Sequence, residues 1–104
     1  MATHADLAVI LVSWNTRALT LDALRTLHAD LASSGPDAEV WIVDNASRDG
    51  TPEAVRAEFP QVHLIACEAN LGFAGANNLA LRRLDFGDAG DGTAKPRAVY
   101  LLNS

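Results

Sequence analysis

The chain has 104 residues, which is enough for one small domain, and 49% of them are hydrophobic, so it can build a core and is not expected to be disordered. Its formal net charge is −5 and it has no cluster of basic residues, which argues against binding to a nucleic-acid backbone. Its single cysteine excludes an internal disulfide and suits a reducing compartment.

Two buried strands with a helix between them are predicted in the first half of the chain. The continuous apolar run Leu7–Val12 is typical of a strand that is buried on both faces. Apolar residues then recur at helical spacing over Leu21–Leu31, and the Ser-Ser-Gly-Pro sequence of residues 33–36 ends this helix. Val40–Val43 is the second strand, and the turn-forming residues Asp44–Gly50 follow it as a loop.

The second half of the chain predicts two more helices and two more strands. Thr51 is expected to cap a helix with Pro52 in its first position, and Pro60 ends this helix before the strand Val62–Ala66. A flexible loop rich in glycine and aspartate is expected over Asp85–Pro96. The third helix and the fourth strand are indicated by the apolar stripe Phe73, Ala76, Ala80 and Leu84 and by the apolar run Val99–Leu102.

The order βαβαβαβ predicts an α/β fold with an open parallel sheet. Strands that are separated by helices run parallel, and their crossovers are almost always right-handed. We therefore expect a Rossmann-like half of a doubly wound sheet, with helices on both faces in three layers, α/β/α. No signal peptide is expected, because Met1–Asp6 is polar and the apolar run after it is too short to cross a bilayer.

Polar residues follow each predicted strand. In a parallel sheet these carboxyl ends lie at one edge, where ligands of open α/β sheets bind. Gly72 and Gly75 would let backbone N–H groups approach a ligand closely. The clusters that should meet at this edge are Ser13–Asn15, Asp44–Ser47, Asn70–Asn78 and Asn103–Ser104.

Several common nucleotide sites are excluded by the residues at the end of the first strand. Residues 13–16 (Ser-Trp-Asn-Thr) contain no glycine, so the GxGxxG turn of dinucleotide-binding proteins is missing, and no GxxxxGK[ST] sequence occurs.

The three histidines fall in different predicted segments and are not expected to share a metal.

Three segments resemble the family 2 glycosyltransferases of the GT-A fold. They are Val12–Asn15, Val43–Thr51 and Asn70–Asn78, and the third is similar to the bacterial branch that includes rhamnosyltransferases and related cell-surface polysaccharide enzymes. The resemblance implies a nucleotide-sugar site. Ser13, Trp14 and Asn15 would border the base, Asp44 and Asn45 would accept hydrogen bonds from base or ribose, and Asn70, Gly72, Gly75 and Asn78 would shape the floor under the ribose and phosphates.

The resemblance also implies a larger parent enzyme. It would move a sugar from a UDP- or dTDP-linked donor to a glycan, lipid or polysaccharide hydroxyl with inversion, and its place would be the cytoplasm or the inner face of the membrane. The family's Asp-x-Asp motif, which holds Mg²⁺ or Mn²⁺, is expected just after Ser104. Residues 1–104 would then be a donor-binding segment without catalytic or metal-binding residues, inactive by itself and prone to self-association through the edge or the uncovered face of its fourth strand.

Other readings of the sequence stay open at this stage. The chain could be a non-catalytic nucleotide-binding or interaction domain, or half of a nucleotidyltransferase, although Asn15–Arg17 does not supply the Gly- and Lys-rich loop that the latter needs. Asp44 could form only its own turn, Trp14 could be a packed aromatic residue, and Asp49 is expected to order the loop. Cys67 is expected to be a small core residue. Ligand and backbone roles stay equally open for Asn70, Asn77 and Asn78, and surface positions are expected for Arg48, Arg82 and Arg83.

Overall fold

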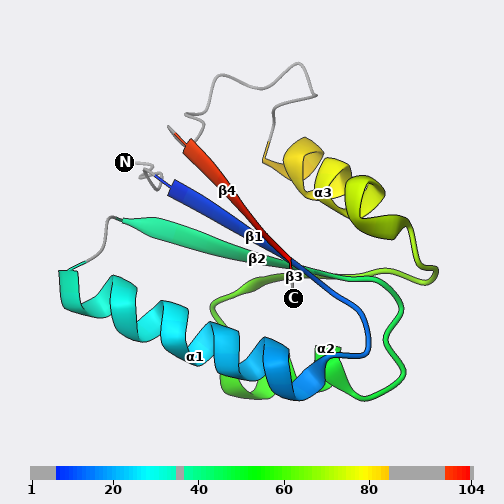
Figure 1. The fold of residues 1–104 in the computed structure, drawn as a ribbon, viewed down its shortest axis with the longest axis horizontal. Coiled ribbons are helices and arrows are strands. Elements are labelled where there is room, and N and C mark those ends of the chain that lie inside the picture. The colour runs from blue at the N-terminus through cyan, green and yellow to red at the C-terminus, as the bar shows by residue number, and fades with distance from the viewer. Residues whose placement is uncertain (1–6, 35–36, 85–97, 104) are drawn as a thin grey trace.

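The computed structural model describes residues 7–34, 37–84 and 98–103, which form four strands and three helices in the predicted order (Figure 1). The elements are β1 (Leu7–Ser13), α1 (Arg17–Ser34), β2 (Ala38–Asp44), α2 (Thr51–Glu58), β3 (His63–Ala66), α3 (Gly72–Arg83) and β4 (Ala98–Asn103). The loop predicted over residues 85–96 lies outside the described residues.

The four strands form one sheet in the order β3-β2-β1-β4, and every pair is parallel. The register places Ser13 beside Asp44 and Asp44 beside Ala66, and it places Val12 beside Asn103. The carboxyl ends of all four strands therefore meet at one edge, and the predicted α/β class with an open parallel sheet is confirmed.

Helices cover both faces of the sheet, as the βαβ connections require. Figure 1 shows α1 and α2 on one face and α3 on the other. Side chains of β1 alternate between the two faces, so Val9 and Leu11 pack with Leu24 and Val55 under α1 and α2. Toward α3, the opposite core is built from Ala8, Ile10, Val12, Val43, Ala76, Ala80 and Leu84.

The start of α2 differs from the prediction. The helix begins at Thr51 itself, so Pro52 is its second residue, and the N-cap is Gly50. Gly50 has φ 82°, a left-handed conformation that glycine adopts without strain, and its carbonyl accepts the first helical bond from Ala54 N. The Thr51 hydroxyl donates to Asp49 instead of capping its own helix.

Phe73 also departs from the predicted apolar stripe of α3. Ala76, Ala80 and Leu84 are buried against the sheet as expected, whereas 45% of the surface of Phe73 is exposed. The helix begins at Gly72, near the edge where the strands end, so its first turn has little sheet beneath it. Phe73 consequently lines a surface pocket. Among the described helices, none is long and apolar enough to cross a membrane.

Candidate functional site

The ends of β1 and β2 are held together by buried hydrogen bonds. Ser13 Oγ donates to Asp44 Oδ1 at 2.9 Å, and Asn45 N donates to the Ser13 carbonyl at 2.8 Å. Ser13 and Asp44 are each 1% exposed. The pairing of the two strands thus continues to their last residues and fixes where their loops begin.

Asp44 also orders the loop that follows it. Its Oδ1 accepts a second bond from Ser47 Oγ at 2.6 Å, and its Oδ2 accepts the Ser47 backbone N–H at 2.8 Å. A carboxylate suits this task because its two oxygens can accept several donors at once. The alternative in which Asp44 forms its own turn is therefore present in the structure, whereas its contact with a ligand stays a prediction.

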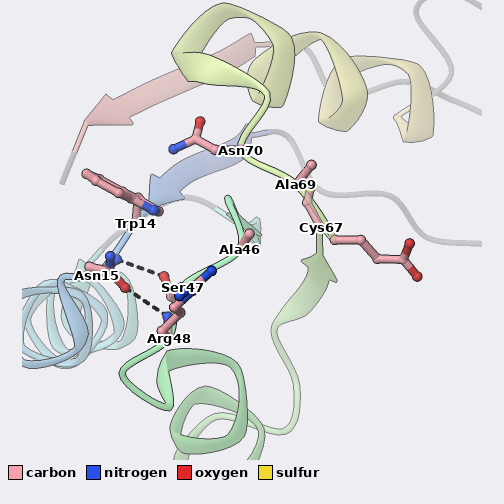
Figure 2. Close-up of a pocket in the computed structure, with 9 residues that line it drawn as sticks. Trp14, Asn15, Ala46, Ser47, Arg48, Cys67, Ala69 and Asn70 are labelled. Carbon is pink, nitrogen blue, oxygen red and sulfur yellow. Dashed lines mark hydrogen bonds between the residues drawn. The ribbon is translucent and has the colours of Figure 1, made fainter.

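Asn15 clamps the same loop from the side of β1. Its backbone N–H donates to Ser47 Oγ and its Oδ1 accepts the Arg48 N–H, both at 2.8 Å (Figure 2). Asn15 has φ 51°, in the left-handed region that asparagine tolerates better than most residues. The two reciprocal bonds keep Asn15 and residues 47–48 side by side.

Asp49 joins the beginnings of two helices. Its Oδ2 accepts the N–H of Arg17, the first residue of α1, at 2.9 Å, and its Oδ1 accepts the N–H of Thr51, the first residue of α2, at 3.2 Å. The Thr51 hydroxyl and these N–H groups lower the pKa of Asp49, and desolvation opposes them only in part. The prediction that Asp49 orders the loop is confirmed.

The turn before α3 forms a third wall at this edge, and Asn45 holds it. Asn45 Oδ1 accepts the Leu71 N–H at 3.0 Å, and its Nδ2 donates to the Gly72 carbonyl at 3.1 Å. Asn70 Oδ1 accepts the Gly72 N–H at 2.7 Å. Gly72 has φ 76°, so the backbone itself requires glycine here.

A pocket of about 700 Å³ lies between the three strand ends. Figure 2 shows Trp14 and Asn15 at the end of β1 on one side and Cys67 and Ala69 after β3 on the other, with the loop that follows β2 between them. Trp14 is 53% exposed, so its ring is available to a ligand. The lining residues are Trp14, Asn15, Ala46, Ser47, Arg48, Cys67, Glu68, Ala69 and Asn70.

A second pocket of about 620 Å³ shares Trp14, Asn15 and Asn70 with the first. It continues toward the start of α3, where Gly72 and Phe73 line it. Trp14 and Asn70 thus stand between two adjoining hollows, and an elongated ligand can occupy both.

The nine predicted site residues divide into three groups. Five line one or both pockets, namely Trp14, Asn15, Asn45, Asn70 and Gly72. Ser13 and Asp44 are buried and support the loop. Gly75 and Asn78 lie on α3. A Cβ at Gly75 would lie only 3.0 Å from Leu71 Cβ, so a larger residue there would crowd Leu71. Asn78 is exposed. The ligand contacts of all nine residues stay predictions.

Nine residues that line the two pockets are absent from the predicted site residues: Val12, Thr16, Ala46, Ser47, Arg48, Cys67, Glu68, Ala69 and Phe73. Cys67 and Glu68 directly follow β3, so the rule that residues after a parallel strand reach the ligand edge could have found them. Cys67 packs partly against the α3 core, as expected, but it is only half-buried. Burial, followed by the nearby charge of Asp44, raises the pKa of its thiol, and Arg83 opposes this shift.

Asn77 and Asn78 have different environments. Asn77 is 4% exposed, and its Nδ2 donates to the Phe73 carbonyl at 3.0 Å. Among the residues that the structure describes, its Oδ1 is a buried acceptor without a hydrogen-bond partner. The backbone role left open for Asn77 is therefore present, and Asn78 points to the surface.

The described residues do not form a metal site. No group of three His, Cys, Asp or Glu side chains with the required arrangement occurs among them. The carboxylates of Asp44 and Asp49 at this edge already accept several N–H and O–H donors each.

Comparison with known proteins identifies the family of this chain. Residues 8–85 match the family model described as Glycosyl transferase family 2. The chain belongs to that family. Among curated relatives, the succinoglycan biosynthesis protein ExoO of Rhizobium meliloti is 38% identical over 82 residues, which cover 78% of this chain and 21% of that protein. An N-acetylglucosaminyl-diphospho-decaprenol L-rhamnosyltransferase of Mycobacterium tuberculosis is 41% identical over 63 residues, or 59% of this chain and 20% of the relative.

A solved structure supports the fold. The mannosyltransferase PcManGT from Pyrobaculum calidifontis, in complex with GDP-Man and Mn²⁺, superposes with a TM-score of 0.62 at 32% identity and covers 78% of this chain and 25% of its own. The GT-A-like fold and the family 2 resemblance are thus confirmed. The chain spans about a fifth of the length of the curated relatives it matches.

Proposed function

We propose that this family 2 domain binds the nucleotide of a sugar-nucleotide donor. The observation that carries the proposal is the pocket of about 700 Å³ at the carboxyl edge of the sheet, walled by all three β–α connections. Its size lies within the range of small-molecule and cofactor sites, and its position is where open α/β sheets bind ligands. The homologous mannosyltransferase, whose solved complex contains GDP-Man, supports the same ligand class.

The pocket offers the base a flat apolar surface and a few polar groups. The exposed ring of Trp14 can stack against a base, and the Asn70 amide nitrogen remains available as a donor because Asn70 Oδ1 already accepts the Gly72 N–H. Glu68 and Arg48 add an acceptor and a cation at the pocket wall. Aromatic stacking with a small number of polar contacts is typical of nucleotide sites.

Charge favours one orientation of the donor. Glu68 lines the first pocket and the buried carboxylate of Asp44 lies under its loop, so two negative groups repel a phosphate there and only one lining cation, Arg48, attracts it. The first turn of α3 has no acidic residue, and the positive end of a helix dipole attracts phosphates. The base therefore occupies the first pocket, and the diphosphate extends toward the start of α3.

The parent enzyme that we propose transfers the sugar to a hydroxyl of a glycan, lipid or polysaccharide with inversion. The acceptor oxygen attacks the anomeric carbon, the nucleoside diphosphate leaves, and a carboxylate downstream of Ser104 takes the hydroxyl proton. A UDP- or dTDP-linked donor is proposed, and Mg²⁺ or Mn²⁺ would be held by residues beyond those described. Its proposed place is the cytoplasm or the inner face of the membrane.

The single cysteine gives a direct test of the nucleotide site. Cys67 lines the pocket, so a bound nucleotide should slow its reaction with N-ethylmaleimide. Because the pKa of the thiol is raised, the reaction is run at about pH 8, where enough thiolate forms. UDP, dTDP and GDP are added separately to the 104-residue chain, with and without Mn²⁺. A nucleotide at ten times its Kd should slow alkylation about tenfold.

A matched control places the only thiol at the opposite edge of the sheet. In a Cys67→Ser, Gln61→Cys variant the thiol replaces the exposed Gln61 in the turn before β3, and nucleotides should not change its alkylation rate. Equal alkylation of Cys67 with and without every nucleotide, together with no heat of binding in calorimetry, would refute the donor site.

A further inference from the structure

Asn45 connects two walls of the pocket that are far apart in the sequence. Its neighbour Asp44 bonds to the end of β1 and to the loop after β2, whereas Asn45 bonds to the turn before α3. Successive side chains of an extended strand point to opposite sides, so these two residues reach in opposite directions. The Asp-Asn pair at the end of β2 thus ties both flanking walls to the centre of the sheet edge.

The turn that Asn45 holds is central to both pockets. Asn70 lines the first and the second pocket, and Gly72 lines the second. The Leu71 N–H donates to the amide oxygen of Asn45, and the Gly72 carbonyl accepts a bond from the amide nitrogen of Asn45. A polar backbone group that loses its hydrogen-bond partner destabilises the structure. Without Asn45 the turn would have to move to find new partners, so its position depends on Asn45.

Asn45 itself has little left to offer a ligand. Its exposed fraction is 2%, and both its amide oxygen and its amide nitrogen are engaged with the backbone. By contrast, Asn70 and Trp14, on either side of the gap, are exposed. The geometry separates the residues that can touch the nucleotide from the one that sets their spacing.

We propose that Asn45 is a positioning residue, which fixes the distance between the β1 wall and the turn before α3 so that Trp14 and Asn70 reach the same ligand. This inference rests on the proposed nucleotide site. It replaces the direct contact between Asn45 and base or ribose that the family resemblance implies. Asn45 lines the second pocket, but its amide is held by Leu71 and Gly72, so its effect on the nucleotide is assigned to the position of that turn.

A double-mutant cycle in nucleotide affinity separates positioning from contact. Asn45→Ala removes both bonds, and Gly72→Ala disturbs the same turn because φ 76° strains an alanine although its Cβ would meet no atom within 4 Å. Each single variant should weaken nucleotide binding about tenfold, and the double variant should bind no more weakly than the weaker single one. If the loss of affinity in the double variant equals the product of the two single losses, the proposal is overturned, because Asn45 and the turn then act independently.

Asn45→Asp provides a graded variant. Its carboxylate still accepts the Leu71 N–H but cannot donate to the Gly72 carbonyl when ionised, so its affinity should lie between wild type and Asn45→Ala. Gln61→Ala removes an exposed amide from the far end of the sheet and should bind like wild type. A Gln61→Ala loss equal to that of Asn45→Ala would overturn the assignment of the effect to Asn45.

Amide hydrogen exchange tests the clamp without a ligand. The Leu71 N–H should be protected in wild type and in Asn45→Asp, and should exchange about tenfold faster in Asn45→Ala while circular dichroism stays unchanged. Unchanged protection of Leu71 in Asn45→Ala overturns the clamp. If wild type binds nucleotide and the Asn45 variants bind it equally well, the positioning role of Asn45 is refuted while the proposed nucleotide site stands. If wild type binds none of UDP, dTDP and GDP, the proposed function fails first and this role with it.

Discussion

The carboxylate of Asp44 is the polar group on which the loop after β2 depends most. It is buried and accepts three bonds, from Ser13 and Ser47. Asp44→Ala leaves these donors without their partner and should lower the free energy of unfolding by about 1–3 kcal/mol, measured by urea denaturation. Asp30→Ala removes an exposed carboxylate from α1 and should change the free energy of unfolding by less than about 0.5 kcal/mol. Equal effects of the two variants would contradict this role of Asp44.

Trp14 should affect binding without affecting stability. Its ring is 53% exposed at the junction of the two pockets, so little core is lost when it is removed. Trp14→Ala should weaken nucleotide binding about tenfold, because base–aromatic stacking is worth about 1–3 kcal/mol. Protection of Cys67 against alkylation measures the affinity. Trp41→Ala is the control, since Trp41 stacks on His63 away from the site and should leave affinity unchanged. Wild-type affinity in Trp14→Ala would count against stacking.

At the scale of the helices, one carboxylate supports the beginnings of both α1 and α2. Asp49 accepts the first N–H of each helix, and α2 has no cap from its own N-cap residue, Gly50. Loss of a cap costs about 1 kcal/mol, so Asp49→Ala should destabilise the domain by about 1–2 kcal/mol in thermal or urea unfolding. Asp30→Ala, which removes an exposed carboxylate from α1, serves as the matched control. A change no larger than that of the control would contradict the shared cap.

The same residue predicts a pH dependence with a definite sign. The pKa of Asp49 is lower in the folded chain than in the unfolded one, so its contribution is fully present above the unfolded pKa, near pH 4. It is lost as the pH falls through the folded pKa. Asp49→Asn should therefore flatten the decline of stability below about pH 4, as followed by urea midpoints across the acid range. An unchanged acid profile in this variant would exclude Asp49 as a source of the decline.

At the scale of the whole molecule, β4 offers a surface for self-association. It is an edge strand, and Leu101, which pairs with Ile10 in the register, is 45% exposed. Unpaired edges with apolar side chains favour pairing with another chain. We expect the 104-residue chain to form dimers at high concentration and Leu101→Glu to suppress them in sedimentation velocity. Leu19→Glu, on α1 and 63% exposed, should leave the dimer intact. A strict monomer at high concentration would contradict this prediction.

The fold could be read from the sequence because its signals are local. Unbroken apolar runs indicated β1 and β2, helical spacing indicated α1, and the alternation of strands and helices implied a parallel sheet. The start of α2 was wrong because Thr51 and Gly50 can both begin a helix, and the choice depends on Asp49 accepting the Thr51 hydroxyl. That contact depends on the tertiary structure and has no local pattern.

The candidate site was predictable only in outline. The rule for strand ends brought the polar clusters after β1, β2 and β3 to one edge, but it could not separate lining residues from supporting ones. Ser13 and Asp44 are buried because they bond to each other across a sequence separation of 31 residues, whereas Trp14 next to them is exposed. Asn77 and Asn78 are adjacent and alike in type, and only the packing of α3 decides which is buried.

The three walls of the pocket belong to three separate β–α connections, and each is anchored mainly by side chains bonded to backbone groups. The strand register ends before the residues that line the first pocket begin, and of these lining residues only Cys67 packs partly against a core. Grafting residues 68–70 from a relative with a different donor should therefore exchange nucleotide preference and leave the melting temperature almost unaltered. If the proposed nucleotide site is correct, donor selectivity can change one connection at a time while the sheet and its cores stay the same.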